Sequence, residues 1–128
     1  MGLATMTGQI GGLRAAADLR TKQFYLVKRV SPTTINLCGA GEVALGVLVN
    51  KPNVGEAADV FAFGYATVIS DGNAAAIAAG DPIKSDANGK AVKSAANRDH
   101  TVGYSDQAST TDGAQMKALI VPGSLSHA

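Results

Sequence analysis

Apolar and polar positions alternate most regularly in residues 60–69, which read VFAFGYATVI. Side chains of a strand point to opposite faces with a period of two, so Phe61, Phe63 and Tyr65 are expected on one face of a long strand. β-Branched and aromatic runs bounded by Gly, Pro, Asn or Asp predict further strands at 24–30, 34–38, 42–50, 83–85, 90–93, 100–105 and 114–121. Short strands separated by glycine-rich turns favour a mainly β fold, a small barrel or sandwich.

One segment after the long strand breaks the β pattern. Asn73 can act as an N-cap for the alanine-rich run that follows it, and Gly80 suits the residue just after a helix end. Pro82 cannot continue a helix. These features predict one short helix over about 73–79.

A short motif occurs twice in the predicted strands. Phe63-Gly64-Tyr65 is echoed by Val102-Gly103-Tyr104, and each copy is followed after an interval by Asp-Gly. Glycine beside an aromatic residue in a strand commonly permits a bulge or the close approach of another backbone. Chance repetition competes in a glycine-rich chain, but the echo favours two related barrel halves.

The chain divides into three parts by composition. Residues 1–22 have glycine at positions 2, 8, 11 and 12 and no capped helix, which indicates an extended N-terminal arm. This segment is either an arm that a partner orders or a tail without a role. Residues 23–123 form the predicted barrel-like domain, and residues 124–128 form a C-terminal tail.

Composition narrows the possible partners. The 128-residue chain has a net charge of +1 and 16% charged residues, so it shows no electrostatic footprint for nucleic acid or an anionic membrane. Alanine supplies little apolar area, so we expect a modest core that gains from packing against other subunits; an ordinary monomer stays possible. No run approaches the roughly 18 apolar residues of a membrane span. The N-terminus lacks the pattern of a signal peptide, so the protein is expected to stay where it is made.

Candidate chemistry is sparse. The single Cys38 excludes an internal disulfide and is better interpreted as a small buried residue than as a reactive thiol. Cys38, His100 and His127 have no zinc-site spacing. His100 next to Asp99 would be the only basis for a small enzyme, and no G-x-S-x-G motif is present.

Two further motifs are better explained by turns. Gly39-x-Gly41 lacks the following helix and the Lys-Ser/Thr pair of a phosphate loop. Asp86-x-Asn88-Gly89 resembles part of a calcium loop, but the later bidentate Glu is missing. These negative results favour a binding or structural module without catalytic residues, metal or cofactor.

A family resemblance rests on two long runs, GVLVNKPNVGEAADVFAFGYATVISDGNAAAIAAGDPIKSDANGKAV and TVGYSDQASTTDGAQMKALIVPG. With their A-x-x-A-G-D-P-I corner, D-A-N-G-K-A-V hairpin and A-L-I-V-P-G end, they resemble the capsid decoration (cement) proteins of tailed bacteriophages over about residues 44–123. The resemblance implies a non-enzymatic virion protein, made in the host cytoplasm and carried on the outer capsid face. It also implies homotrimers at three-fold or quasi-three-fold sites, bound to the major capsid protein, that stabilise the head against DNA pressure.

The residues expected to serve this role fall in two groups. Trimer or core packing is assigned to Phe61, Phe63, Tyr65 and Tyr104. Capsid binding by the N-terminal arm is assigned to Leu3, Ile10, Leu13, Arg14 and Arg20. The alternative function is a β-barrel adhesion or carbohydrate-binding module on the virion surface. That function would need aromatics clustered at an exposed groove, and strand alternation disfavours it.

Overall fold

The computed structural model of the protein describes residues 9–94 and 100–125. These residues form ten β-strands and no helix, which confirms the mainly β prediction. The strands are β1 (Gln9–Ala15), β2 (Leu26–Arg29), β3 (Thr34–Leu37), β4 (Gly46–Leu48), β5 (Ala57–Phe61), β6 (Gly64–Asp71), β7 (Pro82–Ser85), β8 (Ala91–Lys93), β9 (His100–Ser105) and β10 (Asp112–Leu125).

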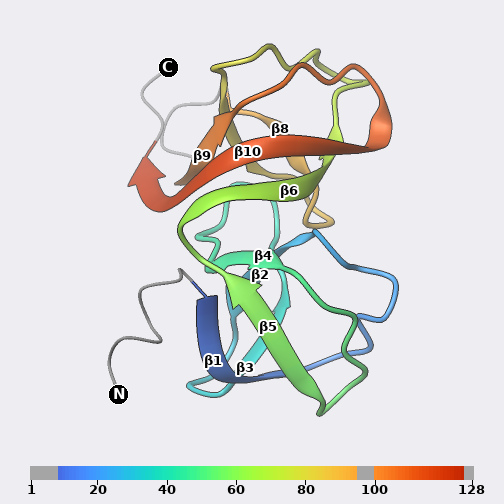
Figure 1. Ribbon diagram of the computed structural model, residues 1–128, viewed down its shortest axis with the longest axis vertical. Helices are drawn as coiled ribbons and strands as arrows, with labels where there is room; N and C mark the ends of the chain where they lie inside the picture. The colour runs from blue at the N-terminus through green and yellow to red at the C-terminus, as the bar shows by residue number, and fades with distance from the viewer. Residues whose placement is uncertain (1–8, 95–99, 126–128) are drawn as a thin grey trace.

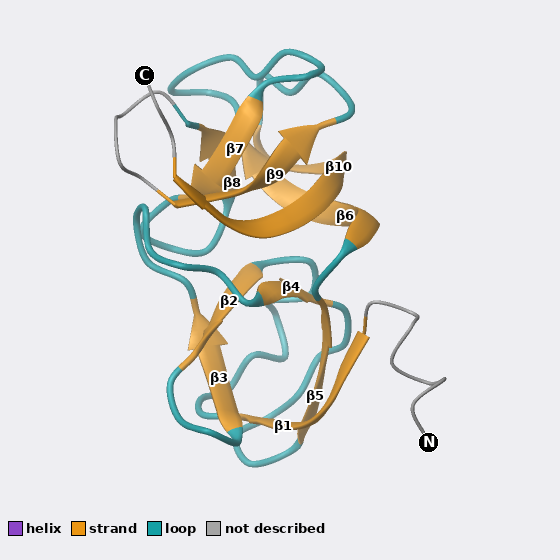
Figure 2. Cartoon of the chain, turned by 90° about the vertical axis from the view of Figure 1, so that its left-hand side faces the viewer, coloured by secondary structure: helices purple, strands orange, loops and turns teal. Residues whose placement is uncertain are grey.

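The strands form two closed five-stranded barrels. The first has the order β1-β3-β2-β4-β5, and the second has the order β10-β6-β8-β7-β9. Figure 1 shows the two barrels stacked along the long axis, and Figure 2 shows the same stacking from the side. The chain passes from the first barrel to the second through Ala62 and Phe63.

The predicted single strand over 60–69 is therefore wrong as one element. β5 ends at Phe61 and β6 begins at Gly64, and the two strands belong to different barrels. Gly64 has a φ of 118°, which lies in a region that side-chain-bearing residues rarely adopt. The glycine thus lets the chain change direction within a sequence that otherwise alternates without interruption.

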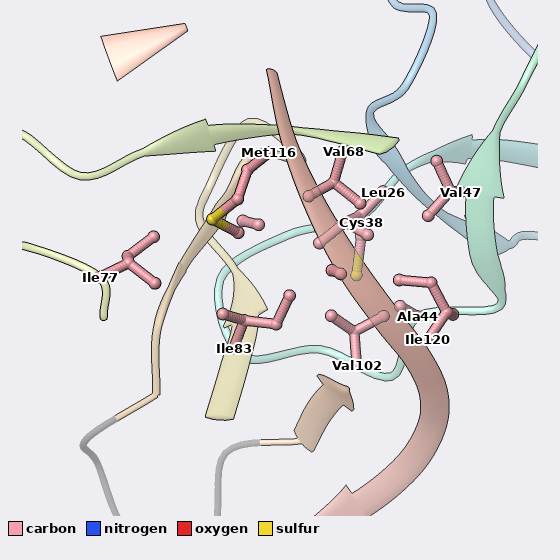
Figure 3. Packing of buried hydrophobic residues seen from close by; sticks show 12 residues of the cluster. Leu26, Cys38, Ala44, Val47, Val68, Ile77, Ile83, Val102, Met116 and Ile120 are labelled. Atoms are coloured by element: carbon pink, nitrogen blue, oxygen red, sulfur yellow. The ribbon is translucent and has the colours of Figure 1, made fainter. Parts of the chain in front are cut away.

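A shared core joins the barrels. Leu26, Cys38 and Val47 of the first barrel pack in one cluster with Val68, Ile83, Val102, Met116 and Ile120 of the second, as Figure 3 shows. A second cluster, which includes Ile35, Leu48 and Val60, fills the first barrel alone. Backbone hydrogen bonds reinforce the junction: the Leu26 amide donates to the Gly89 carbonyl over 2.7 Å.

The predicted N-terminal arm needs correction. β1 is one of the five strands that form the first barrel, antiparallel to β5 and parallel to β3. Leu13 and Leu19 are only 3% and 2% exposed, so this part of the supposed arm contributes to the core. Two adjacent glycines hide the strand in the sequence, and the register with β5 shifts between Ile10 and Leu13. Residues 1–8 lie outside the described residues.

The predicted helix over 73–79 is also wrong. Ile77 is 1% exposed and forms an isolated β-bridge with Ser109, exchanging amide-to-carbonyl hydrogen bonds of 2.8 and 2.9 Å. The Asp71 carboxylate accepts the Asn73 amide, which gives a turn where we expected a cap. A helix of about seven residues is marginal by itself, so burial of Ile77 in an extended pairing prevails.

The sequence echo has a different meaning from the one predicted. Gly64 and Gly103 both lie opposite Ile120, and Tyr65 and Tyr104 both lie opposite Leu119. The two copies therefore mark the strands that flank β10 in one barrel, and they do not mark two barrel halves. Close backbone approach at Gly103 is confirmed, because an added Cβ would overlap the Leu119 carbonyl oxygen.

Candidate functional site

The most distinctive surface of the protein crosses three neighbouring strands of the second barrel. Tyr65 on β6 and Tyr104 on β9 both lie opposite Leu119 on β10, so the three side chains share the outer face of the sheet. Phe63 lies two residues before Tyr65, at the barrel crossing. We call Phe63, Tyr65, Leu119 and Tyr104 the aromatic strip.

The strip is largely exposed to solvent. Phe63, Tyr65 and Tyr104 are 64%, 61% and 47% exposed. The chain has three phenylalanines and three tyrosines, so half of these six aromatic residues lie on the surface. The core-packing half of the prediction for these residues is wrong; their role in a trimer stays a prediction. Aromatic side chains are enriched at protein interfaces, whereas large exposed apolar patches are uncommon on monomers.

Lys117 adds a positive charge at the edge of the strip. Its ammonium lies 5.6 Å from the centroid of the Tyr65 ring. A hollow beside this pair is lined by Tyr65, Ala66, Thr67, Gln107, Gln115, Met116 and Lys117. An interface formed here would therefore combine ring contacts with hydrogen bonds, as the centres and rims of protein interfaces do.

Phe61 differs from the strip residues. It ends β5, opposite Val47 on one side and Gln9 on the other, and is partly buried. Its ring lies close to Gly64, where an added Cβ would stand 3.1 Å from the ring tip. Phe61 therefore packs at the crossing between the barrels.

We expect Phe63→Ala to change the free energy of unfolding of the isolated chain by less than about 1 kcal/mol, because its ring is mostly hydrated already. Chemical denaturation of the two proteins measures this. A loss of about 3–5 kcal/mol, the cost for a fully buried Phe, would show that the ring is packed inside the subunit.

The predicted capsid-binding residues do not form one arm. Leu13 is buried in the first barrel and is not available for an external contact. Arg14 is exposed and donates from Nη1 to the Gly55 carbonyl over 2.9 Å. Ile10 lies on β1 opposite Val60. Leu3 lies outside the described residues, so its assignment stays a prediction.

Arg20, the last of these residues, is held by an acid. Its Nε and Nη2 donate to the two Asp18 carboxylate oxygens at 2.9 and 2.8 Å. The side-chain hydrogen bonds from Arg20, aided by its backbone amide, lower the pKa of Asp18 from 3.8 to about 2. Because the folded-state pKa is depressed, any stabilisation from this exposed pair is present above about pH 4 and is lost as pH falls towards 2.

We therefore expect the Asp18 carboxyl to titrate near pH 2 in the folded protein and to return towards its ordinary value in Arg20→Ala. Carboxyl carbon shifts followed by NMR across pH 1.5–6 report the midpoint. An unchanged midpoint in the variant would show that Arg20 does not set this pKa.

The candidate catalytic and metal-binding residues that the structure describes are not assembled into a site. Cys38 is fully buried, and desolvation raises the pKa of its thiol, in keeping with its prediction as a small core residue. His100 places Nδ1 3.3 Å from the Gly41 carbonyl, while Asp99 and His127 lie outside the described residues. Within residues 9–94 and 100–125, no three His, Cys, Asp or Glu side chains are grouped to hold a metal.

The same part of the chain contains no helix that is long and apolar enough to cross a membrane.

The sequence did not predict Leu119, which lies at the centre of the strip between Tyr65 and Tyr104. The signal for it was available only indirectly, because Leu119 shares the odd positions of residues 114–121 with the polar Gln115 and Lys117, which point outward.

Comparison with known proteins completes this picture. A family model described as Phage cement protein matches residues 7–120, while curated proteins give no match. Among solved structures, the chain is similar to the head fiber gp8.5 N base of bacteriophage phi29, with a TM-score of 0.67 and 16% identity over 93% of this chain and 99% of that one. At this identity the likeness shows a common fold. Because the family model spans most of the sequence, the chain belongs to the phage cement protein family, whose members are structural, non-enzymatic components of the virion.

Proposed function

We propose that the protein is made in the host cytoplasm and binds the outer face of the phage head as a trimer. The binding positions are three-fold or quasi-three-fold sites, where each trimer clamps neighbouring major capsid subunits against the pressure of packaged DNA. Membership of the cement family supports capsid binding. The trimer and its positions on the head are tested by the variants described below.

The aromatic strip is the observation that carries the proposal. Tyr and Phe side chains supply large contact areas and are common at the energetic centres of interfaces. Tyr65, Leu119 and Tyr104 lie on regular strands of a closed barrel, so these side chains are presented by a rigid surface that needs little ordering on binding, with Phe63 beside them at the barrel crossing. We assign the strip to the contact between subunits of the trimer.

A trimer gives modest contacts a large combined effect. Once one subunit is attached to the capsid, the other two bind at a high effective concentration, so the whole trimer is held more tightly than any single contact. A near-neutral chain suits a partner that is protein, because it avoids long-range attraction to the packaged nucleic acid.

A double substitution tests this assignment. Phe63→Ser with Tyr104→Ser should convert a trimer to monomers and weaken binding to expanded, undecorated heads by tenfold or more, the factor for about 1.4 kcal/mol. Light scattering measures the solution mass, and co-sedimentation with heads measures binding. Val54→Ser is a matched control, because Val54 is 61% exposed on the β4–β5 loop of the other barrel.

Three outcomes are decisive. A monomeric wild-type protein that still binds heads would contradict the trimer. A double variant with unchanged mass and binding would contradict the role of the strip. Equal losses in the Val54→Ser control would show that the effect is not specific to the strip.

A further inference from the structure

A second surface lies at the junction of the two barrels, apart from the aromatic strip. It is a groove of about 460 Å³. The first barrel supplies residues from the β1–β2 and β4–β5 connections, and the second supplies residues of β6 and β10. We call it the junction groove; its lining residues are Arg20, Thr21, Gln23, Phe24, Tyr25, Lys51, Ile69, Gly113 and Gln115.

Backbone strain is found in the wall of this groove. Phe24 has a φ of 72°, and among the described residues it is the one non-glycine residue with a positive φ. Its amide donates to the Leu48 carbonyl over 2.6 Å, and its carbonyl accepts the Ile69 amide over 2.9 Å. Elements of both barrels therefore hold Phe24 in an unfavourable conformation. Such strained residues cluster at ligand-binding sites.

The polar groups of the groove are mainly donors, and some are already fixed in position. Arg20 is held by Asp18 through Nε and Nη2, so Nη1 of its guanidinium is not used in this ion pair. Gln23 donates from Nε2 to the Val49 carbonyl over 3.0 Å, so its amide plane is set and its Oε1 stays available as an acceptor. Lys51 is exposed and forms no ion pair within residues 9–94 and 100–125.

The lining itself contains no carboxylate, and although Asp18 offsets the charge of Arg20 from outside the groove, Lys51 favours a ligand with negative charge or many acceptors. Lys51 and Arg20 can meet a carboxylate, while Gln115 and Thr21 can bond to hydroxyl groups. Tyr25 adds an aromatic side chain, and the Lys22 ammonium lies 4.9 Å from its ring centroid. An aromatic ring among amide, hydroxyl and cationic groups suits a pyranose ring that carries an acid.

A peptide fits this groove less well. Extended peptides commonly bind by adding a strand to an open sheet edge. At the groove, β10 is paired with β6 through Gln115 and Ile69, and the Ile69 amide already bonds to the Phe24 carbonyl, so the β6 backbone there is occupied on both sides. A ligand here must be recognised by side chains, which is how sugar rings with several hydroxyl groups are bound.

We propose that the junction groove binds an acidic saccharide, with its carboxylate at Lys51 and Arg20 and a pyranose ring against Tyr25. This activity goes beyond capsid attachment and does not depend on the aromatic strip. A cement protein on the outer head with such a site would attach the virion to acidic polysaccharide. The alternative function in the sequence reasoning, a carbohydrate-binding module, thus reappears as a second activity of the same chain.

Titration with oligogalacturonate tests the proposal on the full chain, with dextran oligomers of matched length as the neutral probe and oligoglutamate as the acidic peptide. Calorimetry gives affinity, and NMR amide shifts give the site. We expect oligogalacturonate to bind more tightly than either probe and to shift the amides of Thr21, Gln23 and Gln115. Lys51→Gln should weaken it about fivefold, the factor for about 1 kcal/mol.

Lys93→Gln is the matched control, because it removes one charge from β8 of the second barrel, away from the groove lining. It should leave the affinity unchanged. Absence of oligogalacturonate binding at millimolar concentration, or equal losses in both lysine variants, would overturn the proposal. Equal binding of dextran would overturn the acidic class, and tighter binding of oligoglutamate would identify a peptide site. None of these outcomes bears on head binding, which the strip variants test separately.

Discussion

Replacing Leu26 by alanine is expected to lower the free energy of unfolding by about 2–5 kcal/mol, a large part of the roughly 5–15 kcal/mol of a typical domain. Leu26 is fully buried and lies in the cluster that both barrels share. Its backbone also binds across the junction to Gly89. The cavity would therefore weaken both barrels together, and denaturation followed by circular dichroism should show one transition at lower denaturant.

An exposed residue provides the comparison for Leu26→Ala. Val54→Ala should change stability by no more than about 0.5 kcal/mol, since Val54 is 61% exposed. Two separate transitions in the Leu26 variant, with the second barrel melting as in the wild type, would contradict the shared core. A cost below about 1 kcal/mol would show that the cluster is loosely packed.

Gly103→Ala is expected to destabilise the protein by about 3 kcal/mol or more. Two effects add at this position. An alanine Cβ would overlap the Leu119 carbonyl oxygen on β10, and overpacking of this kind typically costs 1–3 kcal/mol. The φ of 150° also lies in a region nearly reserved for glycine, with a similar cost. Thermal and chemical denaturation of the purified variant measure the total.

Two other glycines separate these effects. Gly113 has a φ of 84° but no atom within 4 Å of an added Cβ, so Gly113→Ala should cost only about 1–2 kcal/mol for its backbone. Gly72→Ala would overlap the Ser109 carbonyl without a positive φ, so it isolates the steric part. If Gly103→Ala lowered the free energy of unfolding no more than Gly113→Ala does, the close approach of β9 and β10 at Gly103 would be contradicted.

The sequence predicted strands well where β-branched residues are bounded by turn residues. The expected strands at 34–38, 83–85 and 100–105 correspond to β3, β7 and β9. The strand predictions were wrong where a glycine interrupts or conceals the alternation of apolar and polar residues. Gly64 divides an apparently continuous strand between two barrels, and the glycines at 11 and 12 disguised β1 as a flexible arm.

The aromatic residues illustrate what alternation cannot decide. It placed Phe63 and Tyr65 on one face of a strand, but a period of two does not say which face is inside. In a closed five-stranded barrel the interior is narrow, and the inner side of β6 carries Val68 and Ser70. On β6 the small side chains therefore take the interior, and the rings are left outside. Only the closed topology, which depends on long-range pairing, determines this.

The junction groove was beyond sequence reasoning for a similar reason. Arg20, Lys51 and Gln115 are far apart in the chain and share no motif. They meet because the barrels stack through the cluster around Leu26. The strain at Phe24 also depends on two hydrogen bonds from different elements, so no local pattern predicts it.

The location of the aromatic strip on a decorated head is the most direct test of the account. A cryo-electron microscopy map of heads carrying this protein would show which surfaces face other chains. We predict three copies around a three-fold or quasi-three-fold axis, with Phe63, Tyr65 and Tyr104 buried against a neighbouring copy. Single copies, or trimers whose strips face solvent, would contradict the proposed assembly.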